Sequence, residues 1–269
     1  MSKNKLIVTD LFIYPIKSLG GIRVESSAID ERGLMHDRRW VLIDENNRFI
    51  TQRETPTLVF FSTEIVDKHL KVFDSRNQSD YILIELFPQG GEVVSVQIWD
   101  DMCDSILVSE EASNWFSDKL KMKLRLAYMP TTTKRLVDKN YAKEDEVTGF
   151  SDGYPILLIG SASLEELNQR LDQPVGMDRF RPNIVFSGGM AFEEDLMLEI
   201  TINNVLMYGV KLCARCIMIT TNQQTAERTK EPLYTLSTYR KKDNKVYFGQ
   251  NVLAKSKGVI HIGNEISYM

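Results

Sequence analysis

Two of the three cysteines in this 269-residue chain lie three positions apart, with an arginine between them. They are Cys213 and Cys216 in the run KLCARCIMITT, where Arg215 directly precedes the second cysteine. A thiolate binds soft metals and attacks electrophiles, and a neighbouring guanidinium favours the thiolate form. The pair therefore indicates half of a zinc site, a redox dithiol, or one functional thiol beside a bystander.

The sequence around the pair argues against a zinc site and against a thioredoxin-like dithiol. Zinc needs about four ligands, whereas the three histidines of the chain (His36, His69 and His261) are scattered. A thioredoxin-like dithiol lies between a strand and a helix, whereas the β-branched run Ile217–Thr220 predicts a strand after Cys216. Two buried cysteines that pack as small hydrophobes are the commonest alternative for such a pair.

Cationic side chains stand on several predicted turns. Lys17 and Ser18 follow the first strand in YPIKSLGG, Arg38 precedes a strand in HDRRW, and Arg181 precedes a proline in RFRPN. Turns of this type present backbone N–H groups and a positive charge to an anion. Taken alone, Lys17 and Ser18 are better explained as a solvated surface turn and Arg38 as part of a salt-bridged strand edge, whereas Arg181, if buried, needs an anionic partner.

A carboxylate, Asp152, stands in the turn GFSDGYP before the most apolar strand of the chain. It could close an Asx-turn or accept hydrogen bonds from the amines of a heterocycle. Together with the cations and the thiol, it completes the set of groups that an anionic, phosphate-bearing heterocycle with a soft metal requires.

The composition is that of a soluble globular protein, with 43% hydrophobic and 26% charged residues. The formal net charge of −4, with basic residues spread along the chain, argues against nucleic acid as a partner. No apolar run approaches the roughly 20 residues of a membrane helix, and the N-terminus lacks the features of a signal peptide. Because the number of cysteines is odd and no export signal is recognised, we expect free thiols and a cytoplasmic protein. The missing apolar span predicts no membrane partner.

Short strands separated by turn residues continue to about residue 108 and predict a barrel or a sandwich. One hairpin is expected between strands 40–43 and 48–51. Helices are predicted at 110–120 after a Ser109 cap, from a capping box at Ser163 to about residue 171, and from Pro232 to Tyr239. The polar segment 125–149 is expected to be a partly mobile connection between a first β domain and a second, mixed one.

Six motifs, in order along the chain, carry a resemblance to a known family. They are YPIKSLGG, GLMHDRRWVLID, FSDGYPILLIGSASLEELNQRL, RFRPNIVFSG, CARCIMITT and FGQN. The chain resembles MOSC proteins with an N-terminal MOSC β-barrel domain, the group of the mitochondrial amidoxime-reducing component and its bacterial relatives. The resemblance implies a mainly β, α+β fold, with an N-terminal MOSC β-barrel-like domain over residues 1–127 and a MOSC β-barrel domain with a few helices over residues 128–269.

The resemblance also implies a molybdenum cofactor, Mo-molybdopterin, with Cys216 as both the metal ligand and the catalytic residue. Ten other residues match cofactor-binding positions of the family: Lys17, Ser18, Arg38, Asp152, Gly153, Tyr154, Arg181, Ala214, Arg215 and Asn251. Ala214 replaces a serine common in the animal enzymes, and Asn251 stands where some members have tyrosine. Cys213 matches a variable position, which argues against a disulfide.

The activity that the resemblance implies is the reduction of N-hydroxylated small molecules such as amidoximes, hydroxylamines and N-oxides. The chain has no four-cysteine pattern for an iron–sulfur domain, so electrons are expected from a separate flavodoxin-, ferredoxin- or cytochrome-type protein. An alternative from another class is a carrier that holds sulfur or the molybdenum cofactor on Cys216. A thiol redox protein that uses both cysteines is the third hypothesis.

Overall fold

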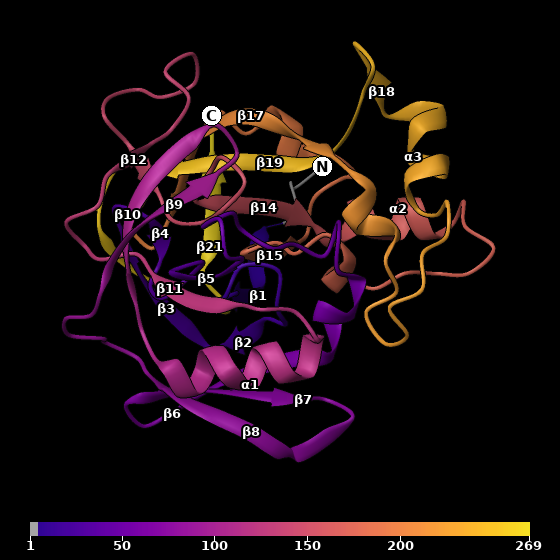
Figure 1. Ribbon diagram of the computed structural model, residues 1–269. Helices are drawn as coiled ribbons and strands as arrows, with labels where there is room; N and C mark the ends of the chain where they lie inside the picture. Colours follow the sequence, from indigo (N-terminus) through magenta and orange to yellow (C-terminus); the bar gives the residue numbers. More distant parts are fainter. Residues whose placement is uncertain (1–4) are drawn as a thin grey trace.

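Strands dominate the computed structural model, which describes residues 5–269 (Figure 1). The strands are β1 (Leu6–Ile13), β2 (Ile22–Val24), β3 (Ser26–Asp30), β4 (Gly33–Leu34), β5 (Trp40–Ile43), β6 (Phe61–Val66), β7 (His69–Asp74), β8 (Asn77–Glu85), β9 (Val93–Ile98), β10 (Asp101–Leu107), β11 (Arg125–Tyr128), β12 (Arg135–Leu136), β13 (Val147–Thr148), β14 (Ile156–Gly160), β15 (Ile184–Ser187), β16 (Glu199–Ile202), β17 (Val205–Arg215), β18 (Lys241–Lys242), β19 (Lys245–Ala254), β20 (Gly258–His261) and β21 (Glu265–Tyr268). The α-helices are α1 (Glu110–Leu120), α2 (Ser161–Asn168) and α3 (Leu233–Tyr239), and the 3-10 helices are η1 (Pro56–Phe60), η2 (Met177–Arg179), η3 (Glu193–Leu196) and η4 (Ile217–Thr220). The predicted α+β, mainly β class is confirmed.

The largest sheet closes into a barrel. Its strands run in the order β14-β15-β1-β21-β16-β17-β19, and β14 also pairs with β19, so no edge is left between them. Apolar side chains alternate along β1, with Leu6, Val8, Leu11 and Ile13 buried. The alternation breaks once, where a bulge between Val8 and Asp10 restores the inward direction. The barrel interior is therefore one hydrophobic core.

Segments from both ends of the sequence build this barrel: the N-terminal strand β1 pairs with β15 and with the last strand, β21. Likewise β3 lies between β4 and β20. Strands from both sides of residue 127 thus share one sheet, and the division into 1–127 and 128–269 stays a prediction about the sequence.

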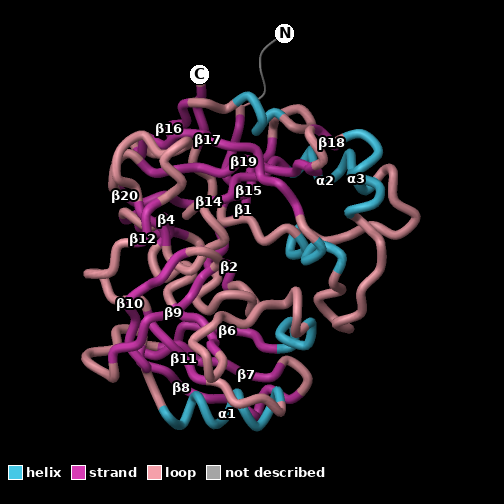
Figure 2. The backbone as a smooth tube through the Cα atoms, turned by 45° about the horizontal axis from the view of Figure 1, so that its top comes forward, coloured by secondary structure: helices cyan, strands magenta, loops and turns pink. Residues whose placement is uncertain are grey.

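A second body contains the four-stranded sheet β5-β11-β10-β9 and the three-stranded sheet β6-β7-β8, with α1 against them (Figure 2). Helix α1 has the predicted bounds: the Ser109 hydroxyl accepts a hydrogen bond from the Ala112 amide at 3.1 Å, and Glu110 and Glu111 occupy the first turn. Phe116 on its inner face is fully buried. The cap fixes where α1 begins, and its apolar face packs against the second core.

Three predictions of secondary structure were wrong, and a fourth was confirmed. Residues 217–220 form the 3-10 helix η4 rather than a strand, because the β-branched run is used to bury Ile219 and Thr220 after β17 has ended. Residues 125–128 of the expected connecting segment are strand β11. The second strand of the expected 40–51 hairpin is reduced to a bridge between Ile43 and Phe49. Helix α3 follows Pro232 as predicted.

The prediction that a capping box at Ser163 begins a helix was also wrong. Helix α2 begins at Ser161 directly after β14, and Ser163 is buried inside it. The Ser163 hydroxyl donates to the carboxylate of Glu194 at 2.8 Å instead of capping its own helix. Glu194 therefore lies, fully buried, beside the start of α2.

Burial raises the pKa of Glu194 to about 7, against the opposing effect of its hydrogen bonds. A group with a raised folded-state pKa favours folding at low pH, and this contribution is lost as pH rises from the unfolded value through about 7. We expect Glu194→Gln, which keeps an acceptor for Ser163, to remove this decline and to raise the free energy of unfolding at pH 8 by about 3 kcal/mol. Urea unfolding at pH 5 and pH 8 measures the effect, with the exposed Glu45→Gln as control. Equal pH slopes in wild type and Glu194→Gln would contradict the assignment.

Candidate cofactor-binding site

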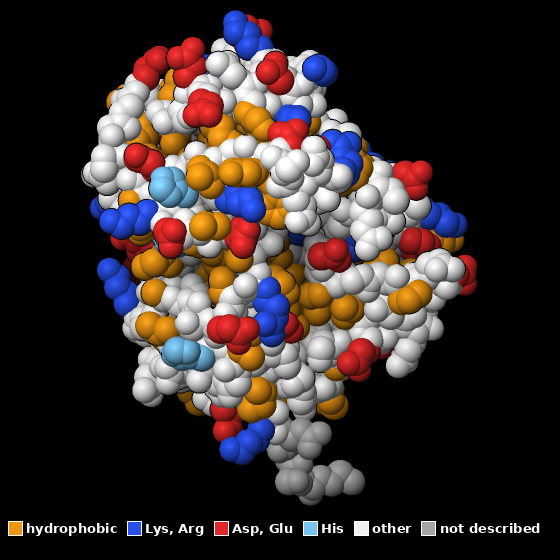
Figure 3. Space-filling view, turned by 90° about the horizontal axis from the view of Figure 1, so that it is seen from below, with side chains coloured by type: hydrophobic (Ala, Val, Ile, Leu, Met, Phe, Trp, Pro, Cys, Tyr) orange, Lys and Arg blue, Asp and Glu red, His pale blue; other side chains and the backbone are white. Residues whose placement is uncertain are grey.

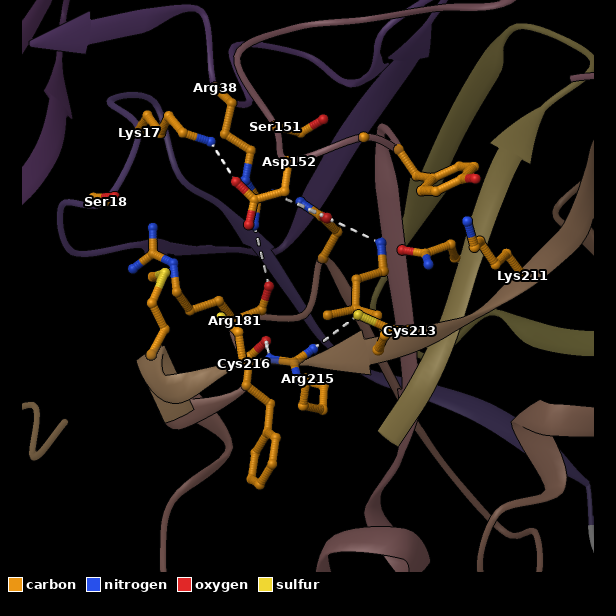
Figure 4. Close-up of a pocket in the computed structure, with 18 of the residues that line it drawn as sticks. Lys17, Ser18, Arg38, Ser151, Asp152, Arg181, Lys211, Cys213, Arg215 and Cys216 are labelled. Atoms are coloured by element: carbon orange, nitrogen blue, oxygen red, sulfur yellow. Dashed lines mark hydrogen bonds and ion pairs between the residues drawn. The ribbon is translucent and has the colours of Figure 1, made fainter. Parts of the chain in front are cut away.

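Residues from both bodies line a cavity of about 450 Å³. Its walls include all eleven residues predicted from the sequence: Lys17, Ser18, Arg38, Asp152, Gly153, Tyr154, Arg181, Ala214, Arg215, Cys216 and Asn251. Lys17 and Ser18 come from the loop after β1 and Arg38 from the loop between β4 and β5, and the rest come from the loops before β14 and β15, the end of β17 and the middle of β19. Figure 4 shows seven of them around one space: Lys17, Ser18, Arg38, Asp152, Arg181, Arg215 and Cys216. The fold thus brings together every position that the motifs indicated.

The backbone is strained at four places around this cavity. Ser18, Arg38, Trp99 and Arg181 have φ angles of 69°, 47°, 56° and 56°, in the left-handed region. Such a conformation costs about 1–3 kcal/mol for a residue other than glycine and persists where the surroundings enforce it. Strain of this kind gathers at functional sites, and here it aims side chains into the cavity.

One carboxylate ties two of the cations together. Lys17 donates from Nζ to Asp152 and to the Phe150 carbonyl, both at 2.7 Å, and Arg53 pairs with the other oxygen of Asp152 at 2.5 Å. Burial raises the pKa of Asp152, but Lys17 and Arg53 outweigh it and hold that pKa well below its usual range. Because 52% of the Asp152 side chain is exposed, solvent screens the pairs and limits their contribution to stability.

A second network is held by a buried acid. The Arg38 guanidinium pairs with Asp37 at 2.5 Å, and it donates to Asn183 Oδ1 at 3.0 Å and to the Arg181 carbonyl at 3.2 Å. Asp37 also accepts from the Tyr14 amide at 2.8 Å. Burial raises the pKa of Asp37, and the neighbouring Arg38 opposes that rise. The network joins the first, second and fourth sequence motifs at one point.

Arg181 is buried without an anionic partner. Its guanidinium lies 4.2 Å from the centre of the Tyr14 ring and forms no hydrogen bond or ion pair with residues 5–269. Burial lowers its pKa to about 10, with Tyr14 opposing and Arg38 adding to the effect. A buried cation that lacks a counter-charge indicates a site for an anion from outside the chain.

The two cysteines have different surroundings. Both are free thiols, but Cys213 lies on β17 beside a bulge, packs against the hydrophobic cluster under α3, and accepts a hydrogen bond from Arg215 at 3.1 Å. Cys216 follows the last residue of β17 and occupies the N-cap position of η4, where it lines the cavity. Burial lowers the pKa of Arg53, but Asp152 and the nearby Cys216 outweigh it and raise that pKa. Both thiols line the cavity, and they differ in their neighbours: Cys213 accepts from Arg215, whereas Cys216 lies beside Arg53.

Sequence reasoning missed other residues of the wall, notably Arg53, Trp99, Asn183 and Lys211. Arg53 lies in a TQRE turn and Trp99 at the β9–β10 turn, in segments that show no cluster of chemical groups. Asn183 could have been predicted from the sequence, because it belongs to the same RFRPN motif as Arg181. The other three, Arg53, Trp99 and Lys211, reach the cavity only through the tertiary arrangement of the two bodies, which a motif search along the sequence does not detect.

Lys17 provides a pH test of this site. Burial lowers its pKa to about 8, with Asp152 opposing, so the ammonium loses its proton as pH rises through that value. We expect the metal-free protein to bind sulfate about tenfold more weakly at pH 9.5 than at pH 7. Calorimetric titration of sulfate across this range measures the affinity, and Lys17→Met should give a weak, nearly flat profile. A flat profile in the wild type would exclude Lys17 from anion binding.

Comparison with known proteins places the chain in a family. Residues 5–123 match the MOSC N-terminal beta barrel domain, and residues 145–267 match the MOSC domain. The chain is 32% identical to mitochondrial amidoxime-reducing component 1 of Mus musculus, over 96% of this chain and 81% of the relative. It belongs to the MOSC family of amidoxime-reducing components. Component 2 of Rattus norvegicus (32% identity, 97% and 83% coverage) and component 1 of Xenopus laevis (30%, 97% and 81%) are similar relatives.

The walls of this MOSC cavity fit an anionic cofactor with a soft metal. Among its described lining residues, seven are lysine or arginine and one, Asp152, is acidic. Within residues 5–269 no three His, Cys, Asp or Glu side chains gather to hold an ion by themselves, so a metal at Cys216 requires ligands that a cofactor brings. A Cβ on Gly153 would meet no atom within 4 Å, which leaves room for a ligand against the backbone. The Nη1 of Arg53 is buried without a partner among residues 5–269.

Charge elsewhere on this MOSC protein is mixed. Figure 3 shows lysine, arginine, aspartate and glutamate side chains interspersed over one face rather than gathered by sign. No helix within residues 5–269 is long and apolar enough to cross a membrane. The strong excess of positive charge is therefore a property of the cavity, not of the face seen in Figure 3.

Proposed function

We propose that this protein is a molybdenum cofactor enzyme that reduces N-hydroxylated compounds with electrons from a separate donor protein. The observation that carries the proposal is Cys216, a free thiol that borders a cavity whose charged walls are almost all cationic. Membership of a family whose relatives are named for amidoxime reduction supports the same activity.

The chain's own residues would hold the cofactor by charge and by one bond to sulfur. Cys216 would supply a thiolate, the ligand type that soft metals prefer. Arg38 and Arg181 would bind the phosphate, because their guanidinium groups form directional hydrogen bonds to phosphate oxygens and Arg181 has no competing anion. Asp152 already accepts from Lys17 and Arg53, so its role in the proposal is to position these cations rather than to bind the pterin amines.

When bound, the cofactor would supply a two-electron redox centre that removes oxygen from an N–OH group. Reduction of N–OH to N–H consumes two electrons and two protons and releases water. Lys17 is tied by its hydrogen bonds to Phe150 and Asp152, so we assign it to charge neutralisation and take both protons from solvent. The cationic walls would favour the reduced, more negative state of the site.

Metal analysis combined with turnover tests the proposal. Protein from a host that makes the cofactor is expected to hold roughly one molybdenum per chain, bound through a soft ligand, and to convert benzamidoxime to benzamidine with a reduced dye. Correctly folded but molybdenum-free protein from that host would contradict the assignment. Bound molybdenum without turnover would instead favour the carrier function on Cys216.

A further inference from the structure

A large aromatic side chain lies exposed at the rim of the cavity. Trp99 occupies the turn between β9 and β10, is 41% exposed, and has a left-handed backbone. It borders both the main cavity and an adjoining one of about 330 Å³, which shares Asp152, Gly153, Tyr154 and Lys211 with the first. The left-handed backbone belongs to the two-residue turn of the β9–β10 hairpin, and it leaves the Trp99 ring at the border of both cavities, where a planar group can stack on it.

Arg53 connects Trp99 to the thiol region of the cavity. Its guanidinium lies 4.8 Å from the centre of the Trp99 ring, while one nitrogen pairs with Asp152 at 2.5 Å. The other terminal nitrogen, Nη1, is buried and has no hydrogen-bond partner among residues 5–269. An unpaired donor on a buried cation indicates an acceptor from outside the chain.

Other residues of the chain hold the Arg53 turn and the Trp99 ring in place. Arg228 donates to the backbone carbonyls of Gln52 and Arg53, and thereby attaches the loop after η4 to the turn that carries Arg53. Phe49 packs edge-on against Trp99, with ring centres 5.0 Å apart. The ring and the guanidinium therefore form a wall that is prepared before a ligand arrives.

We propose that Arg53 and Trp99 form the substrate-facing wall of the site and select N-hydroxylated compounds that carry a planar aromatic group. Arg53 Nη1–H donates to the oxygen of the N-hydroxyl group, and Trp99 stacks against the planar group next to it. This inference rests on the proposed reductase function and adds to it the part of the substrate that the protein recognises.

Substrate preference tests the role of Trp99. We expect Trp99→Ala to lower the ratio of kcat/KM for benzamidoxime to that for acetamidoxime about three- to tenfold, the equivalent of one aromatic pair. Tyr81→Ala, which removes another exposed aromatic ring outside both cavities, should keep the wild-type ratio. An unchanged ratio in Trp99→Ala, with an active wild type, would overturn this inference alone, whereas an inactive wild type with molybdenum bound would overturn the proposed function.

A second measurement does not depend on turnover. Trp40 is fully buried in the second core and Trp115 packs against that core, so Trp99 is the tryptophan that reports on the cavity. Benzamidoxime should quench the emission of metal-free wild type and leave that of metal-free Trp99→Phe unchanged. Equal quenching in the two proteins would place the ligand elsewhere.

Arg53→Lys tests the other half of the wall. This change keeps the charge but loses the fork of donors, and we expect kcat/KM to fall about tenfold or more for both substrates with molybdenum content unchanged. Loss of molybdenum from Arg53→Lys would show instead that the free nitrogen of Arg53 belongs to cofactor binding, and would overturn its assignment to the substrate.

Discussion

Replacing Cys216 by alanine is expected to remove molybdenum from the protein and to abolish the reduction of benzamidoxime. Cys216 lines the cavity directly after the end of β17, and its loss removes the soft ligand from that position. The effect should exceed the about 10- to 100-fold that follows loss of an outer-shell partner in metal sites. Molybdenum content and turnover with a reduced dye, measured on the same preparation, give the result.

Cys213→Ala is the matched control for this experiment. Cys213 also lines the cavity, but its side chain packs against the cluster under α3 and its sulfur accepts a hydrogen bond from Arg215. Its removal should therefore leave molybdenum content near the wild-type value and activity within about threefold. Equal loss of activity in the two variants would favour a thiol redox protein. Retention of both metal and turnover in Cys216→Ala would remove Cys216 from the site.

Arg38→Met is expected to have the largest effect on stability. Arg38 is the ion-pair partner of Asp37, whose side chain is only 2% exposed, and it also donates to Asn183 and to the Arg181 carbonyl. Removing one member of a buried pair leaves an uncompensated charge, so the free energy of unfolding should fall by about 3–5 kcal/mol. Without Arg38 the pKa of Asp37 should rise further, because burial already raises it. Urea unfolding at pH 7 measures the loss.

Two other variants identify the cause of that loss. Asp37→Asn combined with Arg38→Met removes the unpaired charge, so the double variant should be more stable than Arg38→Met alone. Arg23→Met removes a partly exposed arginine paired with Asp10 and Glu25 and should cost less than about 1 kcal/mol. A double variant as unstable as Arg38→Met would indicate that packing of the guanidinium, rather than its charge, is what matters.

Local sequence predicted the elements whose determinants are themselves local. Helix α1 has its cap, its acidic first turn and its apolar face within twelve residues, and its bounds were correct. The eleven candidate residues came from motifs, in which turn residues and charged groups stand next to one another in the chain. These motifs meet at one cavity because the loops after β1 and before β5, β14 and β15 and the barrel strands β17 and β19 all border it.

Local sequence failed where a distant partner decides the structure. The β-branched run at 217–220 became a 3-10 helix because burial of Ile219 and Thr220 outweighed strand propensity. Ser163 does not cap α2, because Glu194 from a distant segment accepts its hydroxyl. In both cases the competing interaction lies outside the window in which a propensity is read.

The sequence by itself determined the kind of chemistry that this protein offers: a thiol, several cations on turns and a mainly β chain with no concentration of charge. The tertiary structure alone decided which groups face one another. It closed β1 into a barrel with β15 and β21, and it placed Arg53 and Trp99 beside Asp152 and the cavity. The reason is physical: residue type sets what a side chain can bind, whereas pairing between distant strands sets the distances over which charge and hydrogen bonds act.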